Sequence, residues 1–436
     1  MKIILNNFAK IKKAEINVDG ITVIAGKNNS GKSTIGKAIF SFFYAFKNLK
    51  KEIFKIKREF FMNSLQEFFY YGNDRDLNLQ KHAHYYFPPS SKEHRFLREI
   101  KLSLHNNLFD DNFNADRVKD ILETYNKYFK DYNVNFEDCL ERAISSLKQV
   151  DDFQITKSVI EDKFNNVFDG QLCNFNNKED ADLSFEIKNG IFSIDFVKNK
   201  VKNFVQPFAI EHDAFLIDNP LILNKLSNKY GLFTSDENYA VESIISSINM
   251  SFTTKKKTSI SSIVAKEKMD QLIDSLDKVV GGEAINTDEG IMLMENKNGS
   301  PTSFKNVSSG LKAFVLLKLL IESEIIKDND FLILDEPEVH LHPEWQIEYA
   351  RIIVMLQKLF NLNIVITTHS RDFLEAIELY SKKYNISNKC NFYISVENDN
   401  EISFKNLSDN PDELYRQLIT PAKVLDKLRF ELEDND

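Results

Sequence analysis

The clearest chemical pattern in this 436-residue chain runs from Gly26 to Thr34 and reads GKNNSGKST. It matches G-x-x-x-x-G-K-[ST], the phosphate-binding P-loop pattern. Gly26 and Gly31 allow a tight turn whose backbone N–H groups point toward one anion. Lys32 can reach the β- and γ-phosphates of a nucleotide, and the Ser33 hydroxyl can bind Mg²⁺. The pattern therefore predicts a site for a nucleoside triphosphate.

Such a loop requires a strand before it and a helix after it. The apolar run ITVIA at residues 21–25 is typical of a buried strand, and IGKAIFSFF at 35–43 has the apolar spacing of a helix. The N-terminus of that helix would direct its positive dipole end at the bound anion. The alternative, a chance match in an ordinary loop, is weakened by the motifs that follow. We expect the whole loop to contact the nucleotide: Gly26, Lys27, Asn28, Asn29, Ser30, Gly31, Lys32, Ser33 and Thr34.

A second apolar run, FLIL at 331–334, ends in Asp335 and Glu336. A buried strand there would place Asp335 beside Ser33, where both could hold Mg²⁺. Glu336 would then be placed to polarise a water molecule for attack on the γ-phosphate. An apolar run followed by Asp-Glu is a weak signal alone, but it is strong in a chain that also has a P-loop.

A third expected strand begins at Asn363, has the apolar run IVI at 364–366, and ends in Thr367, Thr368 and His369. An imidazole at that strand end could bind the γ-phosphate by a hydrogen bond and sense its loss. A histidine after a strand is more often structural, but its place as the third strand end in order favours a functional role.

The segment NVSSGLK at 306–312 precedes an apolar helix. Small hydroxyl residues and glycine at a helix N-terminus form an anion site. This helix leads into the strand that ends at Asp335, so we expect it to cap the nucleotide of a second molecule. The alternative is a plain helix N-cap by Ser308 or Ser309.

The composition is that of a globular chain, with 42% hydrophobic and 28% charged residues. The net charge of −9 gives no global electrostatic reason to expect nucleic-acid binding. Cys139, Cys173 and Cys390 are odd in number and lack metal-site spacing, which favours a reducing compartment. The apolar run at the N-terminus is too short for a signal peptide, and no membrane span is expected. We therefore predict a cytoplasmic location.

Two or three strands are expected in residues 1–25, and the P-loop helix is expected to continue to about residue 60. Apolar residues recur there at helical spacing: Phe46, Leu49, Ile53, Ile56 and Phe60. The opposite face is basic, and it is either solvated or a contact for a polyanion. Residues 61–150 are expected to form a mostly helical insertion. A metal site at His82 and His84 is the less favoured alternative, because no ligand partner stands at suitable spacing.

The chain returns to sheet after the insertion. Asn189-Gly190 between alternating runs predicts a hairpin, and residues 208–218 predict another strand. Helices are expected to about residue 280, with a basic loop at 253–259.

Together the P-loop GKNNSGKS, the insertion, SSGLK, LILDEPEVHLHP and TTHS resemble the ABC-type ATPases related to Rad50, RecF and the overcoming-lysogenization-defect proteins. The forms HLHPEWQ and NVSSGLK point to the last group and its standalone bacterial relatives (AAA15/AAA21, OLD-like). The resemblance covers residues of about 1–45 and 290–380. It implies an α/β fold: an ABC-ATPase head, with a P-loop NTPase mixed sheet plus an antiparallel sheet, and a mostly helical insertion.

The resemblance implies three segments: residues 1–50 as the N-terminal part of the head, 51–160 as the helical insertion, and 161–436 as the C-terminal part. It implies a dimer, or a higher oligomer, that closes around two ATP molecules. Glu336 corresponds to the catalytic glutamate, His369 to the switch histidine and Lys32 to the P-loop lysine. Ser33 and Asp335 correspond to the residues that hold Mg²⁺.

By the same resemblance, the signature loop that acts in trans corresponds to Ser308, Ser309, Gly310 and Lys312. The Val339–Pro343 stretch corresponds to a loop that crosses the dimer seam, so His340 and His342 are read as seam residues rather than metal ligands. The glutamine that usually contacts Mg²⁺ has one candidate, Gln206, which lies near a predicted strand.

The resemblance implies an ATPase that regulates a separate nuclease or toxin, in bacterial defence against phage. The signature reads SSGLK rather than LSGGQ, no long coiled coil is present, and no C-terminal Toprim nuclease is expected. NFYISVENDNEISF at 391–404 reads instead as a hairpin with a polar turn. A DNA-binding repair or recombination ATPase, using the basic residues at 45–58 and 253–258, is the alternative. The ATPase subunit of a membrane transporter is a third, less favoured hypothesis.

Overall fold

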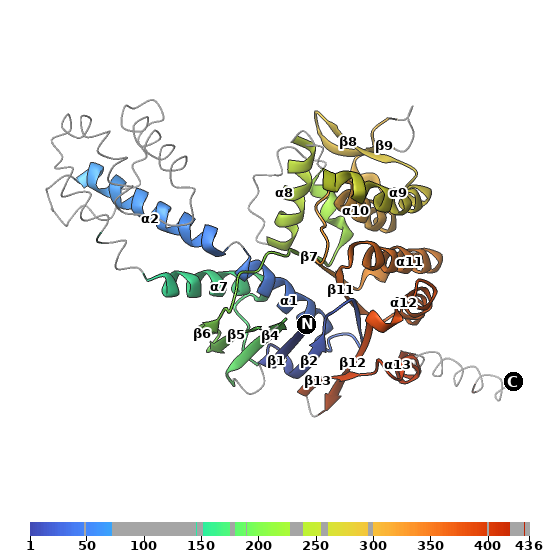
Figure 1. The fold of residues 1–436 in the computed structure, drawn as a ribbon, viewed down its shortest axis with the longest axis horizontal. Coiled ribbons are helices and arrows are strands. Elements are labelled where there is room, and N and C mark those ends of the chain that lie inside the picture. The colour runs from blue at the N-terminus through green and yellow to red at the C-terminus, as the bar shows by residue number, and fades with distance from the viewer. Residues whose placement is uncertain are drawn as a thin grey trace. The chain divides into compact units, whose positions relative to one another are not determined.

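The fold is described from a computed structural model (Figure 1). It describes residues 1–47, 49–71, 145, 151–174, 179–188, 190–226, 239–253, 260–294, 300–398, 401–418 and 431. The chain divides into two compact units. The core unit comprises Met1–Lys47 and Ile160–Asp436, and the inserted unit comprises Asn48–Val159. No helix in the described part of the chain is both long and apolar enough to cross a membrane.

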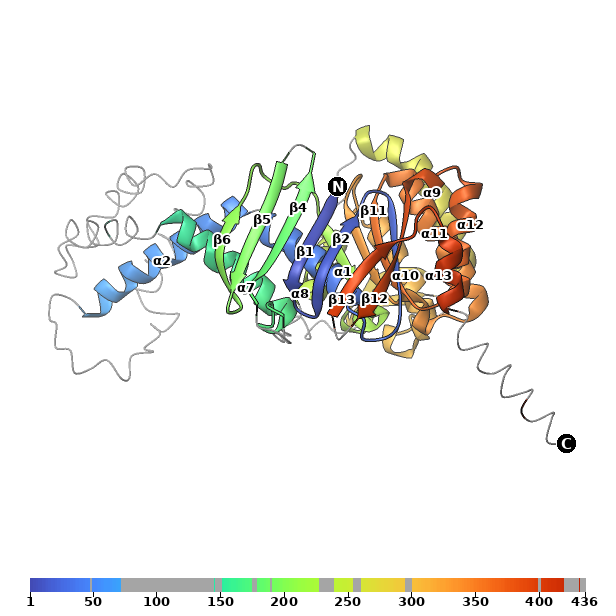
Figure 2. The same ribbon diagram turned by 90° about the horizontal axis from the view of Figure 1, so that it is seen from below.

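An eleven-stranded mixed sheet forms the centre of the core unit, in the order β6-β5-β4-β1-β2-β13-β12-β3-β11-β10-β7. Its strands are β1 (Lys2–Phe8), β2 (Ile11–Asn17), β3 (Ile21–Ala25), β4 (Ala181–Ile187), β5 (Gly190–Val197), β6 (Lys200–Val205), β7 (Ala214–Ile217), β10 (Phe331–Asp335), β11 (Asn363–Thr368), β12 (Cys390–Asn398) and β13 (Glu401–Asn406). Figure 2 shows the strands from β6 to β12 side by side.

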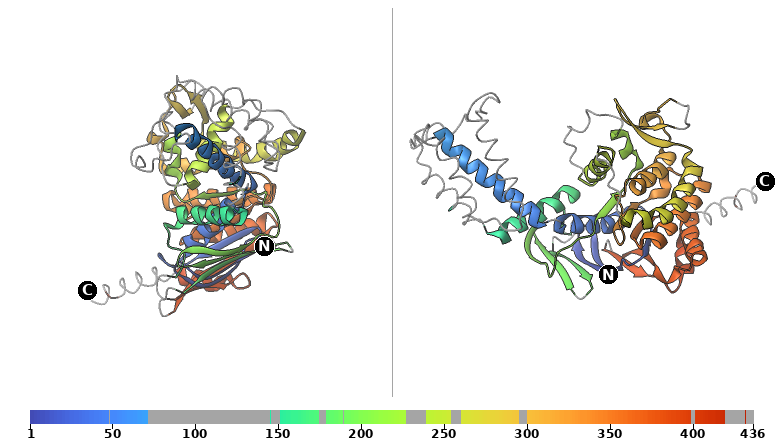
Figure 3. Two further views of the ribbon diagram at one scale, coloured as in Figure 1. Left: turned by 90° about the vertical axis from the view of Figure 1, so that its left-hand side faces the viewer. Right: turned by 45° about the horizontal axis from the view of Figure 1, so that its top comes forward.

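The sheet has a parallel part and a largely antiparallel part. Strands β7, β10, β11, β3 and β12 are parallel neighbours, so their carboxyl ends lie at one edge. From β6 to β2 the pairing is antiparallel, and a parallel β13–β2 contact joins the two parts. Figure 3 shows blue strands from the N-terminal segment beside red strands from the C-terminal segment. A separate hairpin of β8 (Glu283–Thr287) and β9 (Gly290–Met294) completes the predicted fold class of a mixed sheet plus an antiparallel sheet.

The parallel strands are buried on both faces, as their continuous apolar sequences require. On one face, α1 (Lys32–Phe46) packs so closely that a Cβ on Gly36 would lie 2.8 Å from Ile333 Cγ2. On the other face, Leu332 and Leu334 join one apolar cluster with residues from the remaining helices. These helices are α8 (Tyr239–Thr253), α9 (Ile260–Val280), α10 (Ser309–Glu322), α11 (Pro343–Phe360), α12 (Arg371–Lys383) and α13 (Pro411–Leu418).

The predicted continuous helix through residue 60 is wrong. Helix α1 ends at Phe46, and a second helix, α2, spans Leu49–Tyr71. Lys47 adopts an extended conformation with ψ of 134°. It forms a strand-like bridge with Ile210 and an ion pair with Asp213, and these contacts hold the backbone out of the helix. The apolar stripe is therefore divided between two helices.

The inserted unit is described through α2 and the first part of α7 (Asp152–Phe168). Lys57 of α2 pairs with Asp152 of α7, while Lys50, Lys51 and Lys55 are exposed. Most of the predicted helical insertion, including His82 and His84, lies outside the described residues, as does most of the basic loop at 253–259.

Two predicted hairpins are confirmed. β4 and β5 pair around the Asn-Gly turn, with Ile187 opposite Gly190, and β12 and β13 pair with Asn398 opposite Glu401. The β8–β9 hairpin was not predicted, because helices were expected to about residue 280 and no element was assigned to the residues that form the hairpin.

Candidate active site

The P-loop connects the end of β3 to the start of α1, as the pattern predicts. Gly26 has φ of 149°, and a Cβ there would lie 1.8 Å from Ser395 Oγ of β12. Gly31 caps α1 in a left-handed conformation with φ of 77°. Ser30 Oγ donates to the Lys27 carbonyl at 2.6 Å and accepts from Ser395 Oγ at 2.7 Å. These contacts hold the loop against β12, and the N-terminus of α1 faces a cavity.

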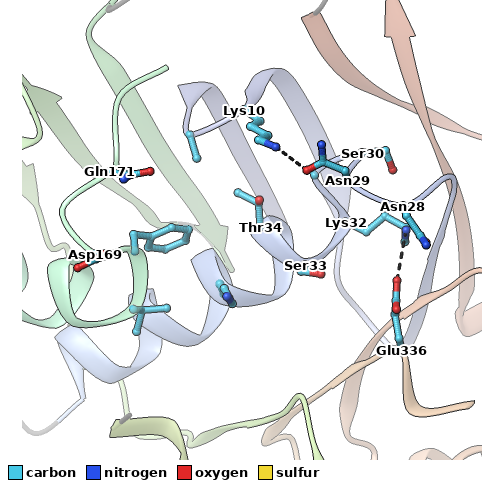
Figure 4. A pocket seen from close by; sticks show the side chains of 15 residues that line it. Lys10, Asn28, Asn29, Ser30, Lys32, Ser33, Thr34, Asp169, Gln171 and Glu336 are labelled. Atoms are coloured by element: carbon cyan, nitrogen blue, oxygen red, sulfur yellow. Dashed lines mark hydrogen bonds and ion pairs between the residues drawn. The ribbon is translucent and has the colours of Figure 1, made fainter. Parts of the chain in front are cut away.

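That cavity has a volume of about 560 Å³, which falls in the range of small-molecule sites. One side is formed by Asn28 to Thr34 of the P-loop, together with Glu336. The other side is formed by Lys10 of the β1–β2 turn and by Phe168, Asp169 and Gln171 at the end of α7. Figure 4 shows Asp169 and Gln171 on one side and Lys32 and Glu336 on the other.

Lys10 and the residues at the end of α7 were missed by the sequence analysis. The end of α7 is held against the β1–β2 turn by a hydrogen bond from Ala9 N to Leu172 O at 2.8 Å. Phe168 packs edge-on against Phe8, with ring centroids 5.1 Å apart. No sequence pattern links these residues to the P-loop: Lys10 lies in an ordinary turn, and the insertion separates the end of α7 from the P-loop in the chain.

The strand pairing brings the predicted acidic residues to the P-loop. β10 lies parallel to β11 with Asp335 opposite Thr367, so the carboxyl ends of both strands meet at the same edge as that of β3. Ser33 Oγ donates to Asp335 Oδ1 at 2.9 Å, and Thr367 Oγ1 donates to the same oxygen. A hydroxyl and a carboxylate at contact distance are oxygen ligands of the kind that Mg²⁺ prefers.

Glu336 follows in a left-handed conformation with φ of 47°. Its backbone N–H donates to Thr367 O at 3.1 Å and Thr367 Oγ1 at 3.0 Å, which fixes this conformation. The Glu336 carboxylate lies 3.5 Å from Lys32 Nζ and 3.7 Å from His369 Nδ1. Lys32 is buried, and its Nζ also donates to the Lys27 carbonyl at 2.8 Å. The structure therefore brings Lys32, Ser33, Asp335, Glu336 and His369 together.

A family model described as the AAA ATPase domain matches residues 1–374. The chain belongs to the AAA ATPase domain family. ATP hydrolysis is the activity of this family, so the pocket described above is that of an ATPase, as the sequence analysis predicted.

Solved structures similar to this AAA ATPase domain include heads of SMC proteins. A structure of an SMC head bound to the C-winged helix domain of ScpA is 12% identical, with a TM-score of 0.42, covering 94% of this chain and 98% of that one. An SMC head domain from Thermotoga maritima is 12% identical, with a TM-score of 0.37, covering 93% and 97%. A Pyrococcus furiosus SMC head bound to the C-terminal domain of ScpA is 11% identical, with a TM-score of 0.39, covering 98% of each chain. These similarities are low in both sequence and structure.

In this AAA ATPase domain, Gln206 is wrong as the candidate for the glutamine beside Mg²⁺. It follows β6, at the edge of the sheet opposite β7. The strand that ends next to Asp335 is β7, and it is followed by Asp218. Asp218 lines a second hollow of about 220 Å³ together with Ser33, Asp335 and Glu336. Desolvation, more than any other cause, raises the pKa of Asp218, and the nearby Asp335 charge raises it too.

The predicted signature loop begins α10 of the AAA ATPase domain. Ser308 is the N-cap and accepts a hydrogen bond from Leu311 N at 3.3 Å, so the simple capping interpretation holds for this residue. Gly310 packs so closely that a Cβ would lie 2.8 Å from the His340 carbonyl oxygen. Lys312 is buried, and this burial lowers its pKa. The Ser309 hydroxyl has no hydrogen-bond partner among the described residues.

Among the residues that the structure describes, no three His, Cys, Asp or Glu side chains are grouped as a metal cluster would require. His340 and His342 lie at the two ends of the turn that leads into α11 of the AAA ATPase domain. Val339, in the preceding turn Pro337–His340, has an exposed fraction of 54%.

Proposed function

We propose that this ATPase is a switch: ATP and Mg²⁺ bind at the P-loop, two copies close around the nucleotides, and closure controls a protein effector. The observation that carries this proposal is the 2.9 Å contact of Ser33 with Asp335, beside the 3.5 Å contact of Lys32 with Glu336. Two sequence motifs about three hundred residues apart form one compact polar site.

The triphosphate would lie at the N-terminus of α1, against the P-loop N–H groups and Lys32. Ser33 and Asp335 fit as the protein ligands of Mg²⁺, with Asp218 close to the same place. When bound, Mg²⁺ would neutralise phosphate charge. The other end of the cavity would receive the base, where the ring of Phe168 offers an apolar surface and Gln171 offers an amide for hydrogen bonds.

Hydrolysis requires a water molecule in line with the γ-phosphate and a group that accepts its proton. Glu336 is placed for that task because its carboxylate lies beside Lys32, the residue that would contact the γ-phosphate. His369 lies on the other side of the same carboxylate and would contact the γ-phosphate as well. Loss of that phosphate would release His369, which is the event that a switch needs.

The second copy would close over the nucleotide through the start of α10, where Ser309 has a hydroxyl to offer and Ser308 and Gly310 shape the turn. Lys312 is buried, so it would contribute by supporting this turn from inside its own subunit. The exposed Val339 and the turn to Pro343 would form part of the seam between the copies. A cytoplasmic nuclease or toxin, in defence against phage, is the effector class that we propose.

ATP hydrolysis by the purified chain tests the proposal. Lys32→Ala should abolish ATP binding, and Glu336→Gln should bind ATP but hydrolyse it at least about 100-fold more slowly. The exposed residues Lys278 and Glu289 supply matched controls, because Lys278→Ala and Glu289→Gln remove the same groups outside the residues that line the site. Normal hydrolysis by Glu336→Gln would remove Glu336 from its proposed role.

A DNA-binding ATPase is the second candidate function. The observation that favours it is the exposure of Lys50, Lys51 and Lys55 on α2. Phosphate contacts from these lysines would make binding weaken steeply as salt is added. ATP-stimulated binding of duplex DNA that is lost in the triple Lys→Ala variant would support this function, and no binding at low salt would exclude it.

A further inference from the structure

The side chain of Glu338 is buried beside the proposed active site and takes no part in the proposed binding or hydrolysis of ATP. Its exposed fraction is only 3%. A buried carboxylate is costly unless hydrogen bonds compensate for the lost water. The two oxygens of Glu338 differ in the hydrogen bonds that they accept, and this difference indicates what the residue does.

One oxygen, Oε1, holds the segment that carries His369. It accepts hydrogen bonds from Thr368 Oγ1 at 2.5 Å, His369 N at 3.0 Å and Ser370 N at 3.3 Å. The His369 ring nitrogen Nδ1 lies 3.6 Å from the same oxygen. Both the backbone and the imidazole of His369 are therefore placed by a single carboxylate oxygen.

The other oxygen, Oε2, is buried with no hydrogen-bond partner in the described part of the chain. A purely structural carboxylate would be expected to use both oxygens, since an unsatisfied buried acceptor destabilises the fold. Oε2 is thus an acceptor that the described part of the fold does not use, on a carboxylate whose other oxygen lies 3.6 Å from the imidazole.

The sheet register explains why Glu338 reaches this place. Thr367 and Thr368 end β11, and successive side chains of a strand point to opposite faces. Thr367 bonds Asp335, while Thr368 bonds Glu338. The turn Pro337–His340 follows Glu336 and brings the Glu338 carboxylate into hydrogen-bond contact with the His369 backbone. The result places the His369 imidazole between two carboxylates, at 3.7 Å from Glu336 and 3.6 Å from Glu338.

We infer that Glu338 is a positioning residue for hydrolysis, which acts through His369. This inference rests on the proposed function, because His369 must itself take part in ATP turnover. Glu338 fixes the residues at the end of β11 so that the imidazole stays beside Glu336. Glu338 also lies next to Val339 in the turn Pro337–His340. A movement of His369 on phosphate release would therefore move this turn, which is part of the proposed seam.

A double-mutant cycle on the full chain tests this inference. Glu338→Gln keeps the volume and the acceptor at Oε1 but removes the charge. Displacing a reacting group slightly can slow a reaction by up to about 100-fold, so we expect kcat to fall about 10- to 100-fold with KM for ATP unchanged. In the His369→Ala background the same change should have no further effect, because the residue acts through the imidazole.

Asp330 supplies the matched control. It is buried at the other end of β10, and its two oxygens accept from Asp213 N and Lys327 N, each at 2.9 Å. Asp330→Asn should leave kcat unchanged, and melting temperatures identify any variant that is merely unfolded. If Glu338→Gln does not fold, Glu338→Asp, which keeps the charge but shortens the reach, should show the same dependence on His369.

Three results would overturn the inference: an unchanged kcat in Glu338→Gln, losses that multiply in the double variant, or an equal loss in Asp330→Asn. The proposed function fails separately, if the wild-type chain itself does not hydrolyse ATP.

Discussion

Ser33 and Asp335 are 302 positions apart in the chain, yet Ser33 Oγ donates a hydrogen bond to Asp335 Oδ1 over 2.9 Å. The contact arises because β3, β11 and β10 lie parallel, so the P-loop after β3 and the acidic pair after β10 meet at one edge of the sheet. Both side chains offer oxygen atoms to the same point in space. This pair is therefore the proposed Mg²⁺ site.

Asp335→Asn should raise the Mg²⁺ concentration needed for half-maximal ATP hydrolysis. Loss of a charged oxygen ligand weakens Mg²⁺ binding, and we expect a shift on the order of 10- to 100-fold. A titration of activity with Mg²⁺ at saturating ATP measures it. Asp328→Asn, a change at an exposed residue outside the site, is the control and should leave the curve in place. An unchanged curve for Asp335→Asn would remove Asp335 from the metal site.

Phe168→Ala should weaken ATP binding if the base lies at the end of α7. Stacking of a base on an aromatic ring contributes roughly 1–3 kcal/mol, which corresponds to at least a 5-fold rise in Kd. Inorganic triphosphate has no base, so its affinity should not change. Phe208→Ala is the control, because Phe208 is a partly exposed phenylalanine outside the cavity. An equal loss for triphosphate would show that the variant damages the P-loop instead.

Asp330 should make the stability of the fold depend on pH. Burial raises the pKa of Asp330 from 3.8 to about 6. The folded chain therefore binds this proton more tightly than the unfolded chain, and the free energy of unfolding falls as the pH rises from about 4 to 6. Relative to Asp330→Asn, which does not titrate, the wild-type chain should lose roughly 1–3 kcal/mol over that range. Denaturant unfolding at several pH values measures it, and a flat or rising difference would contradict the shift.

Two adjacent serines at the start of α10 are expected to have different roles: Ser308 caps the helix, and Ser309 contacts the second copy. Ser308→Ala should lower the free energy of unfolding by about 1 kcal/mol, because it removes the N-cap. Ser309→Ala should leave stability unchanged but reduce ATP-dependent association, because its hydroxyl has no partner among the described residues. Unfolding curves and solution mass distinguish the two effects. Association that survives in Ser309→Ala would exclude its role in trans.

Much of the site could be predicted from sequence because apolar runs that end in polar residues identify parallel strand ends. Asp335, Glu336 and His369 were found in this way, Lys32 and Ser33 were found from the P-loop pattern, and the structure brings all five together. The two hairpins were found because an Asn-Gly turn and alternating side chains are local signals.

Other features depend on tertiary contacts that no local pattern reveals. The break between α1 and α2 is caused by the contacts of Lys47 with Ile210 and Asp213, which are remote in sequence. Phe168 reaches the cavity only because α7 packs against the β1–β2 turn. In the sequence, Glu338 cannot be told apart from any other acidic residue of a turn. Only the register of β10 and β11 brings it into contact with His369.

The solution mass of Glu336→Gln, with and without ATP and Mg²⁺, shows whether two copies close around the nucleotide. Slow hydrolysis should hold the bound ATP in place, so we expect one mass without nucleotide and twice that mass with ATP and Mg²⁺. Lys32→Ala, which lacks the proposed phosphate contact, should not respond. A mass that stays constant while ATP is bound would contradict the switch, and the roles assigned to Ser309 and to the Val339 turn would then be withdrawn.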